Sequence, residues 1–190
     1  EGRAGALARR ARTRRARGQR GRAAVTVREL TRADWPAALA LNVESVVQLS
    51  ELDAARLEWI ASLAHRALAV ERDGELVAFA LAIGPRTAYD SENYRWFDAR
   101  FERFLYLDRI AVAAHARRRG VAGRLYDAME ATAAALERMV CEVSVRPANE
   151  ASLAFHAARG YVELDRLAHG DGKVVALLAK ELAGARAQGA

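Results

Sequence analysis

The best candidate for chemistry in the sequence is a basic, glycine-containing run, Arg117-Arg118-Arg119-Gly120-Val121-Ala122-Gly123. It lies between an apolar run typical of a strand, Phe104 to Val112, and a long stretch with helical periodicity. The glycines therefore fall where a helix begins, and a helix start offers unpaired N–H groups and the positive end of the dipole. Because small residues leave space around those groups and arginines add charge, the run predicts a pyrophosphate site.

This run matches neither of the two common nucleotide-binding loops. It lacks the Gly-Lys-Ser/Thr ending of a P-loop. It also lacks Gly-x-Gly-x-x-Gly and an acidic residue at ribose distance, so a dinucleotide site is not expected. The alternative interpretation is a basic surface turn, since short motifs often match by chance.

The charge of the chain is unevenly distributed. The whole sequence of 190 residues, a length that suits one domain, has a net charge of +6. Nine arginines against one acid give residues 1–22 a charge of +8, so the remainder carries −2. We expect residues 1–22 to be a disordered, solvated tail, because they hold almost no large apolar side chains. Nucleic acid is therefore an unlikely partner, except for weak contact through this tail.

Composition also bears on the compartment. The apolar stretches are too short to cross a bilayer, and no signal peptide is visible. Cys141 is the only cysteine, so no intramolecular disulfide is possible, which suits a reducing cytoplasm. No His/Cys/Asp spacing suggests a metal site. We expect a cytoplasmic protein without a metal and without a membrane partner.

Periodicity and turn signals predict an alternating series of strands and helices. The expected strands are Val25–Leu30, Ala67–Glu71, Leu76–Ile83, Phe104–Val112, Met139–Val145, Tyr161–Leu167 and Lys173–Leu178, and the expected helices are Trp35–Gln48, Asp53–His65, a helix from Gly120 to about Arg138, and Glu150–Arg159. The aromatic-rich stretch Arg86–Phe101 is expected to be irregular. It is interpreted either as core or as a lid over a second substrate.

Two motifs and the order of elements resemble the GNAT N-acetyltransferases. Arg-x-x-Gly-x-Ala at Arg117, Gly120 and Ala122 resembles the acetyl-CoA loop of that family. The segment from Asn149 to Tyr161 is similar to the family's Asn-x-x-Ala-x-x-Phe-Tyr-x-x-x-Gly-Phe. The stretch from Tyr89 to Tyr106 resembles one uncharacterised bacterial branch.

The resemblance implies an α/β (α+β) GNAT acyl-CoA N-acyltransferase fold, a mixed central sheet flanked by helices on both faces. The N-acetyltransferase domain would span residues 23–184, between the tail of residues 1–22 and a C-terminal tail of residues 185–190.

The resemblance also implies where acetyl-CoA, the co-substrate, is held. In the family, pantetheine lies in a split between two parallel strands, here Phe104–Val112 and Met139–Val145. It would pair with the backbone of Ile110, Ala111 and Val112. The pyrophosphate would rest on Arg117, Arg118, Arg119, Gly120, Val121, Ala122 and Gly123, and Asn149 would reach the pantetheine arm.

Two carboxylates are candidates for the catalytic base. Asp108 is preferred, because strand alternation puts it on one face with Tyr106, Ile110 and Val112, and apolar surroundings tend to raise a carboxyl pKa. The alternative for Asp108 is a structural ion pair with an arginine such as Arg109. Glu142 on the neighbouring strand is the rival base.

A histidine stands where the family usually has the tyrosine that protonates the departing thiolate. His156 could act there as an imidazolium acid, or it could be a helix residue packed against the sheet. Tyr161 and Tyr126 are weaker substitutes. Cys141 could in principle carry an acetyl group, but a cysteine in an apolar strand is usually core.

Taken together, these features predict an acetyl-CoA-dependent N-acetyltransferase, a transferase of the acyltransferase class. The amine acceptor, a small molecule or a protein, would attack directly in a ternary complex. The alternative is a non-catalytic acyl-CoA-binding GNAT-fold sensor or partner protein. A homodimer is compatible with either function.

Overall fold

A computed structural model of the chain describes residues 25–45 and 49–182, and it is built on one seven-stranded sheet. The strands are β1 (Val25–Glu29), β2 (Ala64–Arg72), β3 (Glu75–Ile83), β4 (Leu105–Val112), β5 (Arg138–Arg146), β6 (Val162–Ala168) and β7 (Val174–Glu181). Their order across the sheet is β1-β2-β3-β4-β5-β7-β6. Only β4 and β5 are parallel neighbours, and the other pairs are antiparallel. The mixed sheet that the sequence predicts is confirmed.

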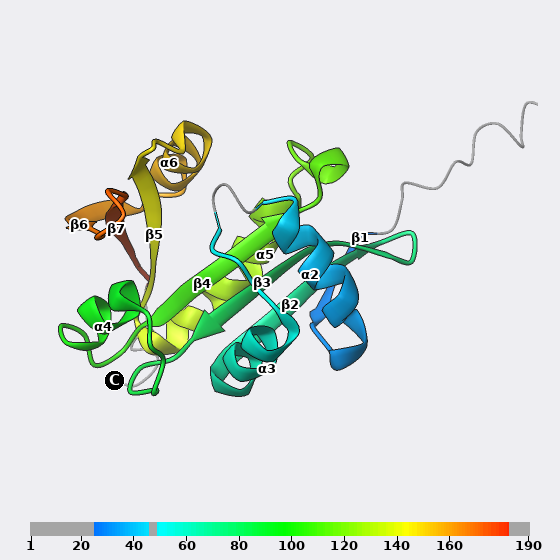
Figure 1. Cartoon of the computed structure of the whole chain (residues 1–190), viewed down its shortest axis with the longest axis horizontal. Coiled ribbons are helices and arrows are strands. Elements are labelled where there is room, and N and C mark those ends of the chain that lie inside the picture. Colours follow the sequence, from blue (N-terminus) through cyan, green and yellow to red (C-terminus); the bar gives the residue numbers. More distant parts are fainter. Residues whose placement is uncertain (1–24, 46–48, 183–190) are drawn as a thin grey trace, which may run out of the picture.

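Helices cover both faces of this sheet, as expected. They are α2 (Trp35–Val43), α3 (Ala54–Leu63), α4 (Glu92–Asp98), α5 (Val121–Ala133) and α6 (Glu150–Ala158). Figure 1 shows α2 and α3 in front of the sheet and α5 behind it. No helix in the described ranges is long and apolar enough to span a membrane.

Local capping explains where several helices begin. The side chains of Asp53 and Asn149 accept hydrogen bonds from the backbone N–H groups of Arg56 (2.7 Å) and Ser152 (3.2 Å) at the starts of α3 and α6. Gly120 precedes α5 with a φ of 78°, a left-handed conformation that suits glycine. These signals are local in the sequence, so the predicted starts of these helices are correct.

Three predicted elements differ most from the structure, and smaller shifts occur elsewhere, such as at the second helix, which ends at Leu63 so that His65 belongs to β2. The helix from Trp35 ends at Val43 rather than Gln48, and residues 46–48 lie outside the described ranges. The helix after Gly120 ends at Ala133 and continues only as a 3₁₀ turn to Leu136. The predicted tails, residues 1–22 and 185–190, also lie outside the described residues.

The third difference is the stretch Arg86–Phe101, which is not irregular throughout because it contains α4. Ser91 caps this helix by accepting a hydrogen bond from the backbone of Tyr94. The side chains of Tyr94 and Phe97 are 1% and 0% exposed, and both pack against Tyr106. These aromatic side chains are core rather than a lid.

A β-bulge in β4 changes which side chains share a face. Tyr106 and Leu107 pair with Ile83 and Ala82, but the next partner, Leu81, lies opposite Arg109. Asp108 is therefore an extra residue, and the alternation of side chains shifts by one beyond it.

The shifted alternation places Tyr106 and Arg109 on one face of the sheet and Ile110 and Val112 on the other. The expectation that Asp108 shares a face with Tyr106, Ile110 and Val112 is consequently wrong. An inserted residue moves every side chain that follows it in the strand to the opposite face of the sheet.

The parallel pairing of β4 with β5 is short. It covers only Leu105 with Met139 and Tyr106 with Val140. Beyond these pairs β4 continues alongside β3 as far as Val112, whereas β5 continues alongside β7. The two strands therefore part, and the edge of β4 at residues 110–112 faces a split in the sheet (Figure 1).

Candidate active site

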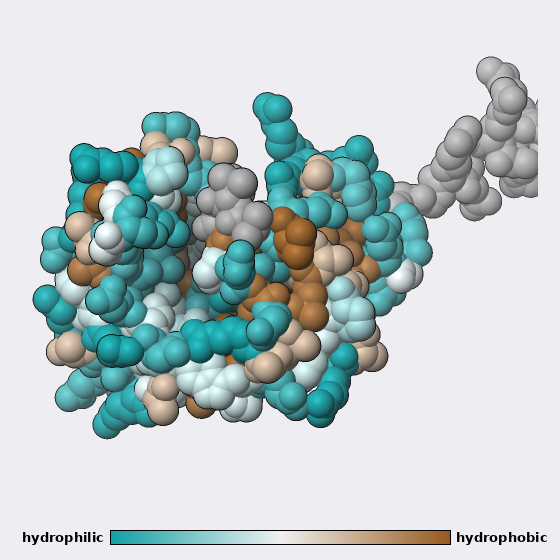
Figure 2. All heavy atoms as spheres, in the orientation of Figure 1, coloured by the Kyte–Doolittle hydropathy of each residue, from teal (hydrophilic) through white to brown (hydrophobic). Residues whose placement is uncertain are grey.

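A cavity of about 420 Å³ occupies the split, with walls from β4, β5, α5, α6 and the start of β7. Figure 2 shows the surface hollowed between the part over α6 and β5 and the part over α2. The predicted site residues that line the cavity are Asp108, Ile110, Val112, Arg117, Ala122, Glu142, Asn149 and His156. Ala111, Arg118, Arg119, Gly120, Val121 and Gly123 are not among its lining residues. The structure thus brings both base candidates, the histidine and part of the glycine loop to one cavity.

The glycine loop leads directly into α5. Arg118, Arg119 and Gly120 are exposed, and α5 begins at Val121, so the N–H groups of its first turn point out of the helix start. The Arg117 guanidinium donates from Nε to the Val112 carbonyl at 3.0 Å. The loop therefore has the open backbone donors and the positive charge that a pyrophosphate needs. Its role in binding remains a prediction.

Glu142 has the properties of a base poised near neutral pH. Tyr106 donates a hydrogen bond from its hydroxyl to Glu142 Oε2 at 2.8 Å. Burial is the largest influence and raises the pKa of Glu142 to about 7, and the charge of Asp108 adds to the rise. The hydrogen bonds from Tyr106 and Asn93 and the charge of Lys173 act in the opposite direction. A carboxylate with this pKa can take a proton and release it again.

Asp108 is bound on both of its oxygens. Arg109 Nε lies 2.7 Å from Oδ2, and the Tyr89 hydroxyl donates to Oδ1. The side chains of Asp108 and Arg109 are only 6% and 4% exposed. The ion pair that the sequence offered as the alternative for Asp108 is therefore present, and the role of Asp108 as a base stays an untested prediction.

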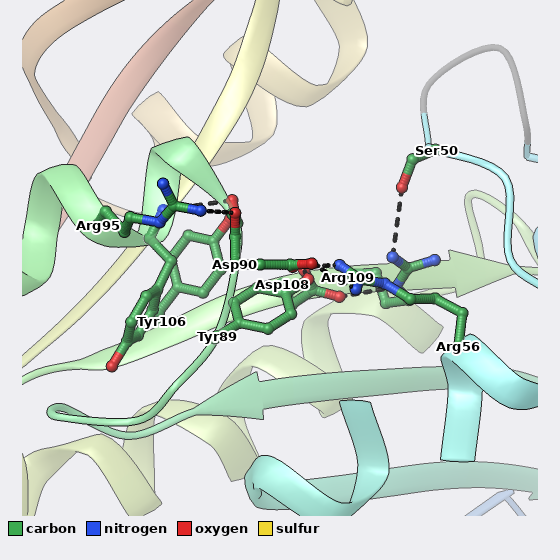
Figure 3. Close-up of polar contacts among 10 residues, drawn as sticks. Ser50, Arg56, Tyr89, Asp90, Arg95, Tyr106, Asp108 and Arg109 are labelled. Carbon is green, nitrogen blue, oxygen red and sulfur yellow. Dashed lines mark hydrogen bonds and ion pairs between the residues drawn. The ribbon is translucent and has the colours of Figure 1, made fainter. Parts of the chain in front are cut away.

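The same ion pair holds the neighbouring segments together (Figure 3). Arg109 also donates to Asn42 Oδ1 at 3.1 Å and to Ser50 Oγ at 3.3 Å. Burial raises the pKa of Tyr89, which keeps its hydroxyl a neutral donor. These contacts indicate that Asp108 and Arg109 fix α2, the segment after it and the segment before α4 against the bulge in β4.

A second buried pair lies on the α5 and α6 side of the cavity. His156 Nε2 is 2.6 Å from the Tyr126 hydroxyl, and the two residues are 4% and 2% exposed. His156 Nδ1 lies 2.7 Å from the Ser152 carbonyl, which can only accept, so Nδ1 carries a proton and Nε2 accepts from Tyr126.

The protonation of His156 bears on its expected role. Burial lowers the pKa of His156, which disfavours the imidazolium form that a direct acid needs. Tyr126 brings a hydroxyl to the same wall of the cavity. The geometry thus supports a neutral Tyr126–His156 pair, and the acid role remains a prediction for either residue.

The remaining candidates have clear positions. Asn149 lines the cavity while its side-chain oxygen caps α6. Cys141 is 3% exposed, and burial raises the pKa of its thiol well above the usual value, as expected for a core cysteine. Within residues 25–45 and 49–182 no group of His, Cys, Asp and Glu could hold a metal ion.

Sequence reasoning missed the side chains that tune Glu142. Tyr106 and Asn93 bond to it, and Lys173 acts on it through its charge. Tyr106 and Glu142 are 36 residues apart in the chain. Their contact depends on the parallel register of β4 and β5, for which the sequence carries no local signal.

Comparison with solved structures shows the same architecture in several proteins. Ard1 from Thermoplasma volcanium has 17% identity and a TM-score of 0.67, and the match covers 84% of this chain and 98% of that one. A ribosomal-protein-alanine N-acetyltransferase from Brucella melitensis has 24% identity and a TM-score of 0.63, over 83% of this chain and 99% of that one. The yncA protein from Salmonella typhimurium, solved with its cofactor acetyl-CoA, has 18% identity and a TM-score of 0.64, over 88% and 99%. These identities show a shared fold.

Sequence comparison extends this result to the family. No curated protein gives a significant match to the sequence. The family model described as "Acetyltransferase (GNAT) family" matches residues 25–161, which include the split, the glycine loop and α6. The chain therefore belongs to the GNAT family of acetyltransferases.

Proposed function

We propose that this protein is an acetyl-CoA-dependent N-acetyltransferase that transfers the acetyl group to a primary amine by direct attack in a ternary complex. The observation that carries the proposal is Glu142, a carboxylate with a pKa of about 7 in the wall of the split between β4 and β5. Membership of the family supports acetyl transfer in general. The position and pKa of Glu142 support an amine as the acceptor, because an ammonium must lose a proton before it can attack.

Different residues of the split bind different parts of acetyl-CoA in this proposal. The edge of β4 at residues 110–112 offers backbone groups to the pantetheine arm, with Asn149 on the opposite wall. The loop from Arg117 to Gly123 offers N–H groups and guanidinium charge to the pyrophosphate. Holding both reactants in one cavity makes the attack effectively unimolecular.

Glu142 then removes a proton from the bound ammonium, and the free amine attacks the carbonyl carbon of the thioester. The new C–N bond forms as the C–S bond breaks, and the nitrogen then releases its second proton to solvent while the departing sulfur takes one up. The departing thiolate takes its proton from solvent or from Tyr126, whose hydroxyl must first release its hydrogen bond to His156 Nε2 and then regains a proton from solvent. Glu142 returns its proton to solvent, which a pKa of about 7 permits.

Direct attack is favoured over an acetyl-enzyme. Cys141 is the only cysteine of the chain, it is buried, and its thiol pKa is raised. A nucleophilic cysteine needs a lowered pKa and access to the substrate. Cys141 has neither property.

The experiment is to block the glycine loop with Gly120→Glu and to measure acetyl-CoA binding by calorimetry. A Cβ at Gly120 meets no atom within 4 Å, so the substitution causes no clash and adds a negative charge to the predicted phosphate loop, where it should repel phosphate. Gly74→Glu is the matched control, because Gly74 has a similar φ of +83° and equally open space but lies between β2 and β3, outside the predicted phosphate loop. We expect binding to be lost in Gly120→Glu and kept in Gly74→Glu.

Unchanged affinity in Gly120→Glu would refute the loop assignment. CoA release against a panel of amines tests the reaction itself. Acetyl-CoA binding without release from any amine would favour the alternative, a non-catalytic acyl-CoA-binding sensor.

A further inference from the structure

Lys173 stands at the edge of the cavity in a well-anchored turn. Its backbone N–H donates to Asp171 Oδ1 at 2.9 Å, and its carbonyl accepts from the N–H of His169 at 2.8 Å. His169 in turn contacts Glu92 of α4 through Nδ1 and Oε2, at 3.1 Å. The turn is thus held both internally and against α4, which fixes the point from which the Lys173 side chain extends.

The start of β7 brings Lys173 to the cavity that Glu142 lines. Leu177 lies opposite Glu142, and Val175 lies opposite Ser144. Lys173 lies two residues before Val175, immediately ahead of the first residue of β7. Lys173 and Glu142 both line the cavity.

Two cations that line the cavity, Arg117 and Lys173, have no ion-pair partner among the described residues. Asp108 and Arg109 pair with each other, and Arg117 contacts Val112 and belongs to the predicted phosphate loop. The half-buried ammonium of Lys173 makes no hydrogen bond or ion pair within the described residues. The charge of Lys173 acts on Glu142, and once Glu142 has taken a proton from the substrate this cation favours another anionic group in the cavity.

We propose that the acceptor is a small amino carboxylate, such as a free α-amino acid, whose amine meets Glu142 while its carboxylate pairs with Lys173. This inference rests on the proposed function and deepens it. A peptide N-terminus would present an amide where Lys173 offers a charge. A polyamine would bring a second cation toward Lys173 and Arg109, where like charges repel.

The experiment compares each standard L-amino acid with its C-terminal amide as acceptor, using CoA release. The parent protein should prefer the free acid of its best substrate. Lys173→Met should lower kcat/KM for that acid by about 10- to 100-fold, the effect of losing one charge-assisted hydrogen bond. The amide should change by less than about threefold, because it makes no ion pair to lose.

Two controls separate this ion pair from other effects of Lys173. Lys173→Arg keeps the charge and should retain most of the rate with the acid. All variants are compared at pH 9, where Glu142 is ionised, because Lys173 also lowers the pKa of Glu142. Calorimetry of the acid added to the protein saturated with CoA gives a readout without turnover, and this binding should be lost in Lys173→Met.

Several results would overturn the inference. If the parent protein acetylates amides, peptides or polyamines as well as it acetylates free acids, the proposed function stands. The proposal that the acceptor is an amino carboxylate is then refuted. An equal loss for acid and amide in Lys173→Met refutes the ion pair. If no amine is acetylated and no amino acid binds the CoA complex, the inference and the proposed function both fail.

Discussion

Two carboxylates line the cavity in the split, and their surroundings differ. The charge of Asp108 acts on Glu142 and raises its pKa. Asp108 is paired with a buried cation, Arg109, at 2.7 Å. Glu142 is bound by a neutral hydroxyl, that of Tyr106, at 2.8 Å.

The comparison shows that the hydrogen-bond or ion-pair partner of a carboxylate influences whether that carboxylate can act as a base. The buried cation Arg109 holds Asp108 in an ion pair, the arrangement that the sequence offered as the structural alternative for this residue. A neutral donor leaves burial as the larger influence on Glu142, which raises its pKa to about 7. The sequence preferred Asp108 as the base, and the surroundings of the two carboxylates are the reason why we propose Glu142 instead.

The largest effect is expected from Glu142→Gln, which keeps the shape of the side chain and removes the base. We expect kcat/KM to fall by roughly 10²–10⁴-fold, the usual contribution of a general base. Acetyl-CoA affinity should remain close to that of the parent. Steady-state kinetics and calorimetry measure the two quantities. Normal turnover in this variant, combined with a large loss of turnover in Asp108→Asn, would show that Asp108 rather than Glu142 is the base.

Asp108→Asn should instead act mainly on stability. It leaves Arg109, whose side chain is 4% exposed, without its counter-ion. Removing one partner of a buried ion pair costs about 3–5 kcal/mol of unfolding free energy, measured here by denaturant titration. The double variant Asp108→Asn with Arg109→Met should recover part of this loss. A single variant as stable as the parent would contradict the scaffold role.

Tyr106→Phe tests the neutral partner of Glu142. The hydrogen bond from Tyr106 lowers the pKa of Glu142, so its removal should raise that pKa above about 7. Since the base must be ionised, the rising limb of kcat/KM against pH should move alkaline by roughly one unit. We expect roughly a tenfold loss at pH 6 and little loss at pH 9. A uniform loss at every pH would indicate a packing defect rather than a change in the base.

The smallest effect is expected on the far wall of the split. His156→Phe removes the acceptor of the Tyr126 hydroxyl, so kcat should fall by roughly 3- to 10-fold with acetyl-CoA affinity retained. His156→Tyr should restore part of the rate, because a phenol can also donate a proton. If His156→Phe turns over normally, the thiolate leaves unassisted and His156 is a packed helix residue.

Local features of the sequence predicted most of the fold. Caps such as Asp53 and Asn149, the glycine at Gly120 and the alternating strands act over a few residues, so their signals lie within short windows. The α4 helix was not predicted because it is only seven residues long, and its aromatic residues do not show a clear helical period. Ser91 caps its start. The glycine loop and the family resemblance were also available from the sequence, because both are contiguous motifs.

Tertiary structure alone decided the chemistry of the site. The bulge at Asp108 depends on pairing with β3, and the contact of Tyr126 with His156 joins residues 30 apart. Whether a carboxylate is a base or half of an ion pair depends on its burial and its partner. For Glu142 and Asp108 those are set by the register of strands and the packing of helices, which bring distant residues into the low-dielectric space where a pKa shifts.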